Sequence, residues 1–165
     1  MEQYKHERHR VHRLTYHFVF VTKYRRPVIS EEVGVFLKQR MQELISLSDG
    51  ELLACETDVD HIHILAALPP DIAPAAAVRG WKTALSVSLH KNEELMPFVR
   101  KYLYGEKTPL WSASYFVATT GGVTMETIRE YVNSQQSEEH QKRRYEKTGR
   151  YKGAWARSQA RKKNG

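Results

Sequence analysis

The sequence lacks the features that mark secreted and membrane proteins. Cys55 is its only cysteine, so no internal disulfide can form. No apolar stretch approaches the roughly 20 residues needed to cross a bilayer, and the polar, basic N-terminus has no apolar segment of the kind found in signal peptides. We therefore expect a soluble cytoplasmic protein that has no contact with membranes.

Acidic residues are scarce at one end of the chain. Residues 140–165 carry ten lysines and arginines against one acid, Glu146, whereas residues 1–139 carry 16 basic and 18 acidic side chains. The net charge of +7 thus belongs to the C-terminal segment. Because aromatic residues are interleaved with these cations, the segment suits attraction to phosphate and stacking on bases, although a solvated tail that aids solubility fits equally well. We assign residues 1–138 to one domain and residues 139–165 to a basic C-terminal extension.

Apolar residues follow two periods along the domain, and these periods predict its secondary structure. Runs of β-branched and aromatic residues predict strands, and apolar residues at three- and four-residue spacing predict helices. The expected strands are residues 14–22, 51–58, 61–68 and 111–119, and the expected helices are residues 31–48, 74–90 and 125–137. The residues before the first strand, which include His6, His9 and His12, are expected to form a solvated basic arm.

The order of these elements predicts a fold class. A β-α-β-β-α-β order with an added C-terminal helix is typical of an α+β, ferredoxin-like (RRM-like) fold, in which an antiparallel sheet carries two helices on one face. The other face of the sheet is then free for function.

Two histidines in the third expected strand point to a metal site. In Asp60-His61-Ile62-His63-Ile64 the imidazoles are two positions apart, so a strand sends both to the same face, near enough to share one ion. The alternative is a pair of ordinary structural histidines, because any half-buried strand can carry His-x-His. The interpretation depends on what other donors reach the pair.

The last expected helix offers a second group of chemically useful side chains. Tyr131 and Gln135 are four residues apart, so on a helix they lie on the same face about one turn apart. A tyrosine can form a covalent intermediate, and a glutamine carbonyl oxygen can bind a hard divalent ion. An ordinary amphipathic helix also explains this spacing.

Four segments of the sequence resemble the single-tyrosine HUH transposases. These are the small enzymes of insertion sequences that move as single-stranded DNA, together with their relatives associated with repetitive extragenic palindromes. The resemblance rests on residues 15–26, 60–65, 110–119 and 131–135, which occur in the family's order.

The resemblance implies an activity and its residues. It implies that His61, His63 and Gln135 hold Mg²⁺ or Mn²⁺, and that Tyr131 attacks a DNA phosphate and is left as a 5′-phosphotyrosine. It further implies a nucleoid-associated homodimer that binds single-stranded DNA with a hairpin and completes its active sites in trans. Tyr131, on the C-terminal helix, is then the nucleophile.

Several residues near these motifs are further candidates. Phosphate contacts are expected from Lys23, Arg25 and Arg26, and base stacking from Tyr24, with plain exposed surface as the alternative. Asp60 is either an acceptor that orients a ligand histidine or a turn residue. His17 is either a ligand or DNA contact, or a structural histidine.

Three other functions fit parts of the sequence. A domesticated repeat-associated tyrosine endonuclease would cut DNA without transposing it. A noncatalytic RRM-like nucleic-acid-binding module would share the fold but not need the histidines. A generic phosphodiesterase would use the histidines but not need Tyr131.

Overall fold

The computed structural model describes residues 4–103 and 108–120. The predicted helix at 125–137, with Tyr131 and Gln135, and the predicted extension at 139–165 lie outside the described residues. Within the described ranges, no helix is long and apolar enough to span a membrane.

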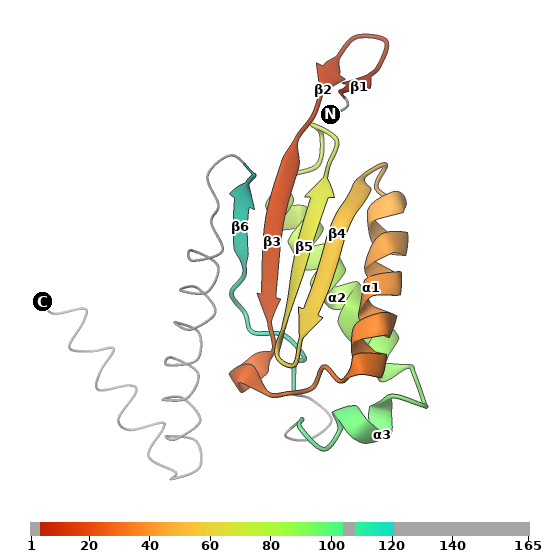
Figure 1. Ribbon diagram of the computed structural model, residues 1–165, viewed down its shortest axis with the longest axis vertical. Coiled ribbons are helices and arrows are strands. Elements are labelled where there is room, and N and C mark those ends of the chain that lie inside the picture. The colour runs from red at the N-terminus through yellow and green to blue at the C-terminus, as the bar shows by residue number, and fades with distance from the viewer. Residues whose placement is uncertain (1–3, 104–107, 121–165) are drawn as a thin grey trace, which may run out of the picture.

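A four-stranded antiparallel sheet forms the centre of the domain (Figure 1). Its strands are β3 (Thr15–Val21), β4 (Glu51–Asp58), β5 (His61–Ala67) and β6 (Phe116–Thr119), in the order β4-β5-β3-β6. β4 and β5 form a hairpin, and β3 pairs with both β5 and β6. This topology confirms the predicted α+β, ferredoxin-like fold.

Two long helices cover one face of the sheet (Figure 1). α1 (Glu31–Ser46) begins after Ser30, whose hydroxyl accepts a hydrogen bond from Val33 N at 3.3 Å, and α2 (Pro74–His90) begins with a proline suited to a first helical turn. A short helix, α3 (Met96–Val99), follows. The bounds of α1, α2, β3, β4 and β5 agree with prediction to within two residues at each end.

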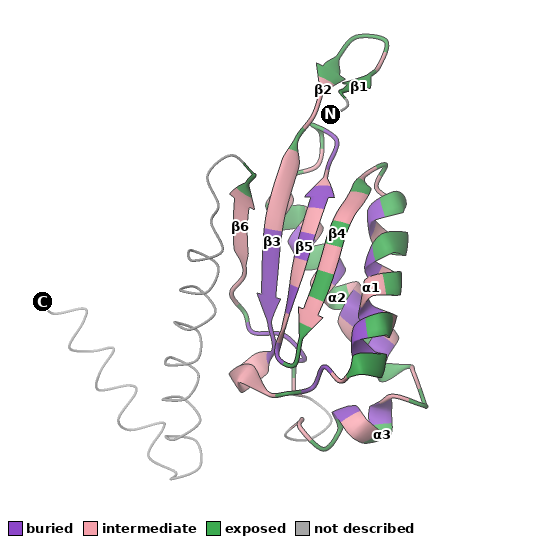
Figure 2. Cartoon of the chain, in the orientation of Figure 1, coloured by how far each residue is buried: buried purple, intermediate pink, exposed green. Residues whose placement is uncertain are grey.

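The core lies between the sheet and these helices (Figure 2). Alternate residues of β3 and β5 face it, among them Phe18, Phe20, Ile62 and Ile64, all fully buried. The ring of Trp81 from α2 meets Phe18 edge to face, with centroids 5.1 Å apart. The intervening residues of both strands therefore face the side of the sheet opposite α1 and α2.

One prediction about the strands was wrong. Residues 111–115 do not continue β6: Trp111 makes an isolated bridge to Thr22, and Lys82 Nζ donates to the backbone oxygens of Ser112 at 2.5 Å and Ser114 at 3.0 Å. Those carbonyls are used by a side chain of α2 instead of a strand partner.

The expected N-terminal arm is also ordered. β1 (Lys5–His6) and β2 (Val11–His12) pair as a small antiparallel hairpin that extends beyond the end of the sheet (Figure 1). Each strand has only two residues, too few to show a strand period in the sequence.

The close approach of α1 to β4 makes Gly34 sensitive to substitution. A Cβ at Gly34 would lie 2.6 Å from Thr57 Oγ1, whereas a Cβ at Gly80 in α2 would meet nothing within 4 Å. We expect Gly34→Ala to lower the free energy of unfolding by about 1–2 kcal/mol. Gly80→Ala, the matched control, should raise it by about 0.5–1 kcal/mol because alanine is the better helix former. Urea denaturation of both variants checks this, and a shift of the same sign in both would contradict it.

Candidate active site

The histidine pair lies on the face of the sheet opposite α1 and α2. In the β3–β5 register His61 pairs with Val21 and His63 with Val19, so both imidazoles share a face with His17 of β3. The ring centroids of His61 and His63 are 4.9 Å apart, and those of His17 and His63 are 6.2 Å apart. Three imidazoles thus cluster on adjacent strands, with His63 in the middle.

Asp60 fixes the orientation of His61 from the turn before β5. Its Oδ1 lies 2.7 Å from His61 Nδ1, and its Oδ2 accepts a hydrogen bond from Arg25 Nε at 2.6 Å. The side chains of all three residues are 12–15% exposed. Because an ionised carboxylate only accepts hydrogen bonds, Nδ1 of His61 carries a proton, which in the neutral ring places the lone pair on Nε2 for a ligand.

The charge on Asp60 is stabilised by its two partners. Burial alone would raise the pKa of this carboxyl, but the hydrogen bonds from His61 and Arg25, together with their charges, outweigh it and lower the pKa below its ordinary value. Asp60 is therefore ionised at neutral pH, as its role as a double acceptor requires.

A strained turn after β3 brings Arg25 to Asp60. Tyr24 and Arg25 have left-handed backbone angles, with φ of 58° and 50°, which non-glycine residues rarely adopt. The turn is held by Thr22, which is fully buried and whose hydroxyl donates to the backbone oxygen of Arg26 at 2.7 Å. Thr22 N also donates to the backbone oxygen of Asp60 at 2.9 Å, so this turn and the β4–β5 turn are bonded directly.

His63 is held in its neutral form. Burial, followed by the nearby charges of His61 and His17, lowers its pKa to about 4. Burial likewise lowers the pKa of His17. A neutral imidazole is the form that binds a metal ion, so His63 is ready as a ligand without first losing a proton.

The described residues include two imidazoles that could form part of a metal site. Within residues 4–103 and 108–120, no group of three or more histidine, cysteine or acidic side chains could hold a metal ion. The imidazole of His61, oriented by Asp60, and the neutral imidazole of His63 fit a divalent cation but need a further donor. The predicted third ligand, Gln135, and the predicted nucleophile, Tyr131, lie outside the described residues.

The four residues predicted to contact DNA lie at the same end of the sheet as His61. Lys23, Tyr24 and Arg25 form the short 3-10 helix η1 (Lys23–Arg25), and Arg26 follows it. The Lys23 ammonium lies 5.1 Å from the centre of the Tyr24 ring. Arg25 bonds Asp60 within the protein, so it has a role inside the site that sequence reasoning missed. The two residues are 35 positions apart, and no local pattern signals their contact.

Comparisons with known proteins bear on this arrangement. The model of the family described as "Transposase IS200 like" matches residues 10–135. The chain is similar to the ISDra2 transposase TnpA of Deinococcus radiodurans, with 30% identity over 129 residues that cover 78% of this chain and 89% of that protein. It is also similar to the transposase for insertion sequence element IS200 of Salmonella typhimurium, with 29% identity over 124 residues, covering 75% and 78% of the two chains.

A solved structure shows the same fold. The crystal structure of a proposed transposase from Deinococcus radiodurans R1 matches with a TM-score of 0.70 and 27% identity, covering 79% of this chain and 97% of that one. Both the fold and the sequence thus resemble transposases over most of the chain.

Proposed function

Because the chain belongs to the IS200-like transposases, a family that cuts and rejoins DNA, we propose that it is a divalent-metal-dependent transposase that acts on single-stranded DNA beside a hairpin. The observation that carries the proposal is the pair His61 and His63 on the face of the sheet opposite α1 and α2. Asp60 orients the ring of His61, and the ring of His63 is neutral. The hairpin follows from the family resemblance of the sequence.

In this proposal, His61, His63 and Gln135 hold Mg²⁺ or Mn²⁺. When bound, the ion supplies Lewis-acid polarisation of the scissile phosphate and stabilises charge on the leaving oxygen. Asp60 keeps Nε2 of His61 available, and Arg25 keeps Asp60 ionised and in place. Gln135 would come from the C-terminal helix, of the same subunit or of the partner in a homodimer.

Tyr131 is the proposed nucleophile. Its phenolic oxygen attacks phosphorus, the bond from phosphorus to the 3′-oxygen breaks, and the proton lost by the phenol balances the one gained by the 3′-oxygen. The products are a 5′-phosphotyrosine and a free 3′-hydroxyl. Since attack of a 3′-hydroxyl on such a linkage reverses these steps, strands are exchanged without ATP or hydrolytic water.

The surface of the sheet argues against a noncatalytic RRM-like module. Such modules stack bases on aromatic side chains of the two central strands. Here the central strands are β3 and β5, and their residues on the face opposite α1 and α2 are Thr15, His17, Val19, Val21, His61, His63, Leu65 and Ala67. Among the described residues, this part of the sheet carries no phenylalanine, tyrosine or tryptophan.

The proposal predicts a metal-dependent covalent adduct. The full chain is incubated with Mg²⁺ or Mn²⁺ and a hairpin oligonucleotide from the DNA that flanks its gene, and a protein–DNA species that survives denaturation is expected on a gel. EDTA should abolish the adduct, and added Mn²⁺ should restore it. An adduct of equal yield in EDTA would overturn the metal dependence.

The same experiment distinguishes a transposase from a domesticated endonuclease. Both form the adduct, but only the transposase is expected to join the cut ends of an element into a new strand. Sequencing of the reaction products checks for that joint.

A further inference from the structure

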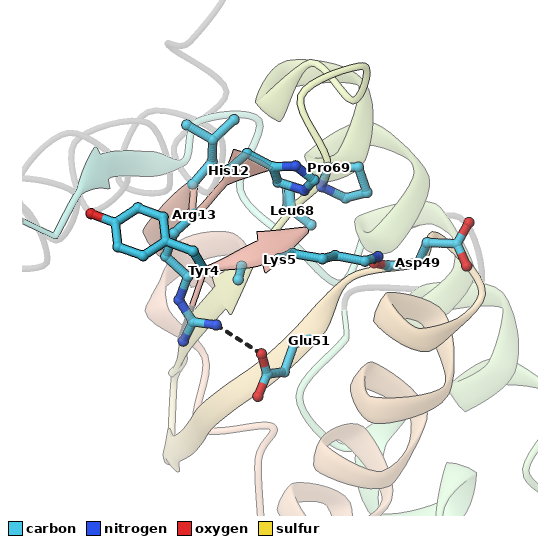
Figure 3. A pocket seen from close by; sticks show the side chains of 10 residues that line it. Tyr4, Lys5, His12, Arg13, Asp49, Glu51, Leu68 and Pro69 are labelled. Carbon is cyan, nitrogen blue, oxygen red and sulfur yellow. Dashed lines mark hydrogen bonds and ion pairs between the residues drawn. The ribbon is translucent and has the colours of Figure 1, made fainter. Parts of the chain in front are cut away.

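The N-terminal hairpin encloses a cavity at the far end of the sheet from the histidines. The cavity, of about 420 Å³, lies between β1–β2, the start of β4 and the segment after β5 (Figure 3). In the β3–β5 register Thr15 and Ala67 pair at this end, and Val21 and His61 pair at the other. The cavity is therefore separate from the candidate active site, and its volume is in the range of small-ligand sites.

One side of the cavity is aromatic and apolar. Tyr4 lies at its rim and is 58% exposed, and Leu68 and Pro69 also line it (Figure 3). An exposed tyrosine at the rim of a cavity offers a stacking surface to a planar ring.

Two residues of the cavity lining each have a buried nitrogen atom without a hydrogen-bond partner. Within the described part of the chain, neither His12 Nδ1 nor Arg13 Nε has one. Burying a polar group without a hydrogen-bond partner is unfavourable, so a ligand that bonds these atoms would be favoured. The Arg13 guanidinium is itself held in place, since its NH1 donates to Glu51 Oε2 at 3.0 Å (Figure 3).

The two cations of the cavity lining each have a partner and could share it with an anionic group. Lys5 Nζ donates to the backbone oxygen of Asp49 at 3.3 Å and lies 3.8 Å from Glu7 Oε1, a long and exposed ion pair that leaves the ammonium able to contact a further anion. The carboxylate of Asp49 is directed away from the other lining side chains (Figure 3). The carboxylate of Glu51, bonded to Arg13, is an acceptor for an amino group. The lining thus combines cations, one acceptor and a stacking surface.

We propose that this cavity binds one unstacked nucleotide of single-stranded DNA, with the phosphate at Lys5 and Arg13 and the base beside Tyr4. A nucleotide is the ligand class that joins an anion to a planar ring with donors and acceptors on its edge. The match to the family model begins at residue 10, so Tyr4 and Lys5 precede the matched range, whereas the other lining residues lie within it. The inference rests on the proposed function only in taking DNA as the polymer.

Binding of a short fluorescein-labelled single-stranded oligonucleotide to the full chain tests the site. Measurements by fluorescence anisotropy in EDTA exclude cleavage, so failure of the proposed chemistry does not affect them. Since stacking on an aromatic side chain is worth about 1–3 kcal/mol per base, Tyr4→Ala should weaken binding about 5- to 150-fold without changing the charge. Tyr4→Phe should bind like the wild type.

Arg8→Ala is the matched control for charge. Arg8 lies in the same hairpin, is exposed, and does not line the cavity. Lys5→Ala should weaken binding several-fold more than Arg8→Ala does, because each loses one positive charge but only Lys5 reaches the cavity. Equal losses in these two variants, with Tyr4→Ala unchanged, would show nonspecific attraction and overturn the proposal.

The chemical class of the ligand is tested by following the ring nitrogens of His12 in NMR titrations with different ligands. Addition of dAMP is expected to shift its side-chain ¹⁵N resonances in the NMR spectrum, whereas inorganic phosphate should shift them less because it lacks the base. A poly-glutamate peptide that shifts them while dAMP does not would overturn the nucleotide assignment in favour of an acidic protein partner.

Discussion

The Tyr131→Phe variant is expected to form no covalent adduct with hairpin DNA, a loss of at least about a thousandfold in rate. The substitution removes only the phenolic oxygen that would attack phosphorus, so folding, metal binding and DNA binding should be unchanged. The adduct is measured on a denaturing gel in the presence of Mn²⁺, and DNA binding is measured separately by anisotropy in EDTA.

Tyr115→Phe is the control for this result. Tyr115 is half-buried just before β6, with the Lys82 ammonium 6.0 Å from its ring centre, so it packs within the domain. Phenylalanine keeps that packing, and the adduct should form at the wild-type rate. An adduct that persists in Tyr131→Phe but is lost in Tyr115→Phe would move the nucleophile to residue 115.

The Asp60→Asn variant is expected to bind Mn²⁺ about 10- to 100-fold more weakly than the wild type. Asp60 accepts from both His61 Nδ1 and Arg25 Nε, whereas an asparagine has one accepting oxygen. If that oxygen faces Arg25, the amide nitrogen donates to His61 Nδ1 and drives the proton to Nε2, which blocks the ligand atom. If it faces His61, the amide nitrogen opposes the Arg25 donor and the turn loses its anchor.

Two readouts separate this mechanism from a general loss of charge. Titration calorimetry or electron paramagnetic resonance gives the Mn²⁺ affinity, and ¹⁵N NMR of the metal-free protein reports which nitrogen of His61 carries the proton. Asp58→Asn is the control, because Asp58 pairs with His61 in the β4–β5 register and is exposed, so it removes the same charge nearby. An equal loss of affinity in both variants, with no change at His61, would refute the positioning role of Asp60.

The histidine pair could be predicted because its geometry is local. Strand residues two positions apart share a face whatever the rest of the fold does, so the sequence around His61 and His63 was sufficient. The same holds for α1 and α2, whose apolar periods and N-terminal residues fixed their bounds closely.

The contacts that hold Asp60 and orient His61 could not be predicted in this way. The Arg25–Asp60 bond depends on left-handed backbone at Tyr24 and Arg25, which neither residue type favours. Residues 111–115 have strand-like composition, but the Lys82 side chain takes two of their carbonyls, and only the folded structure reveals that competition. The β1–β2 hairpin is too short to give a pattern at all.

The bond between the two turns ties the readiness of the site to the completion of folding. The β4–β5 hairpin alone brings His61 and His63 together, since their spacing and pairing are local. Arg25 reaches Asp60 only after β3 has paired with β5, a contact between distant parts of the chain that forms late in the folding of such topologies. A chain in which β3 has not yet paired with β5 therefore carries Asp60 and both histidines without the Arg25 bond that holds Asp60 in place, and we expect cutting of DNA only from a chain with the finished sheet.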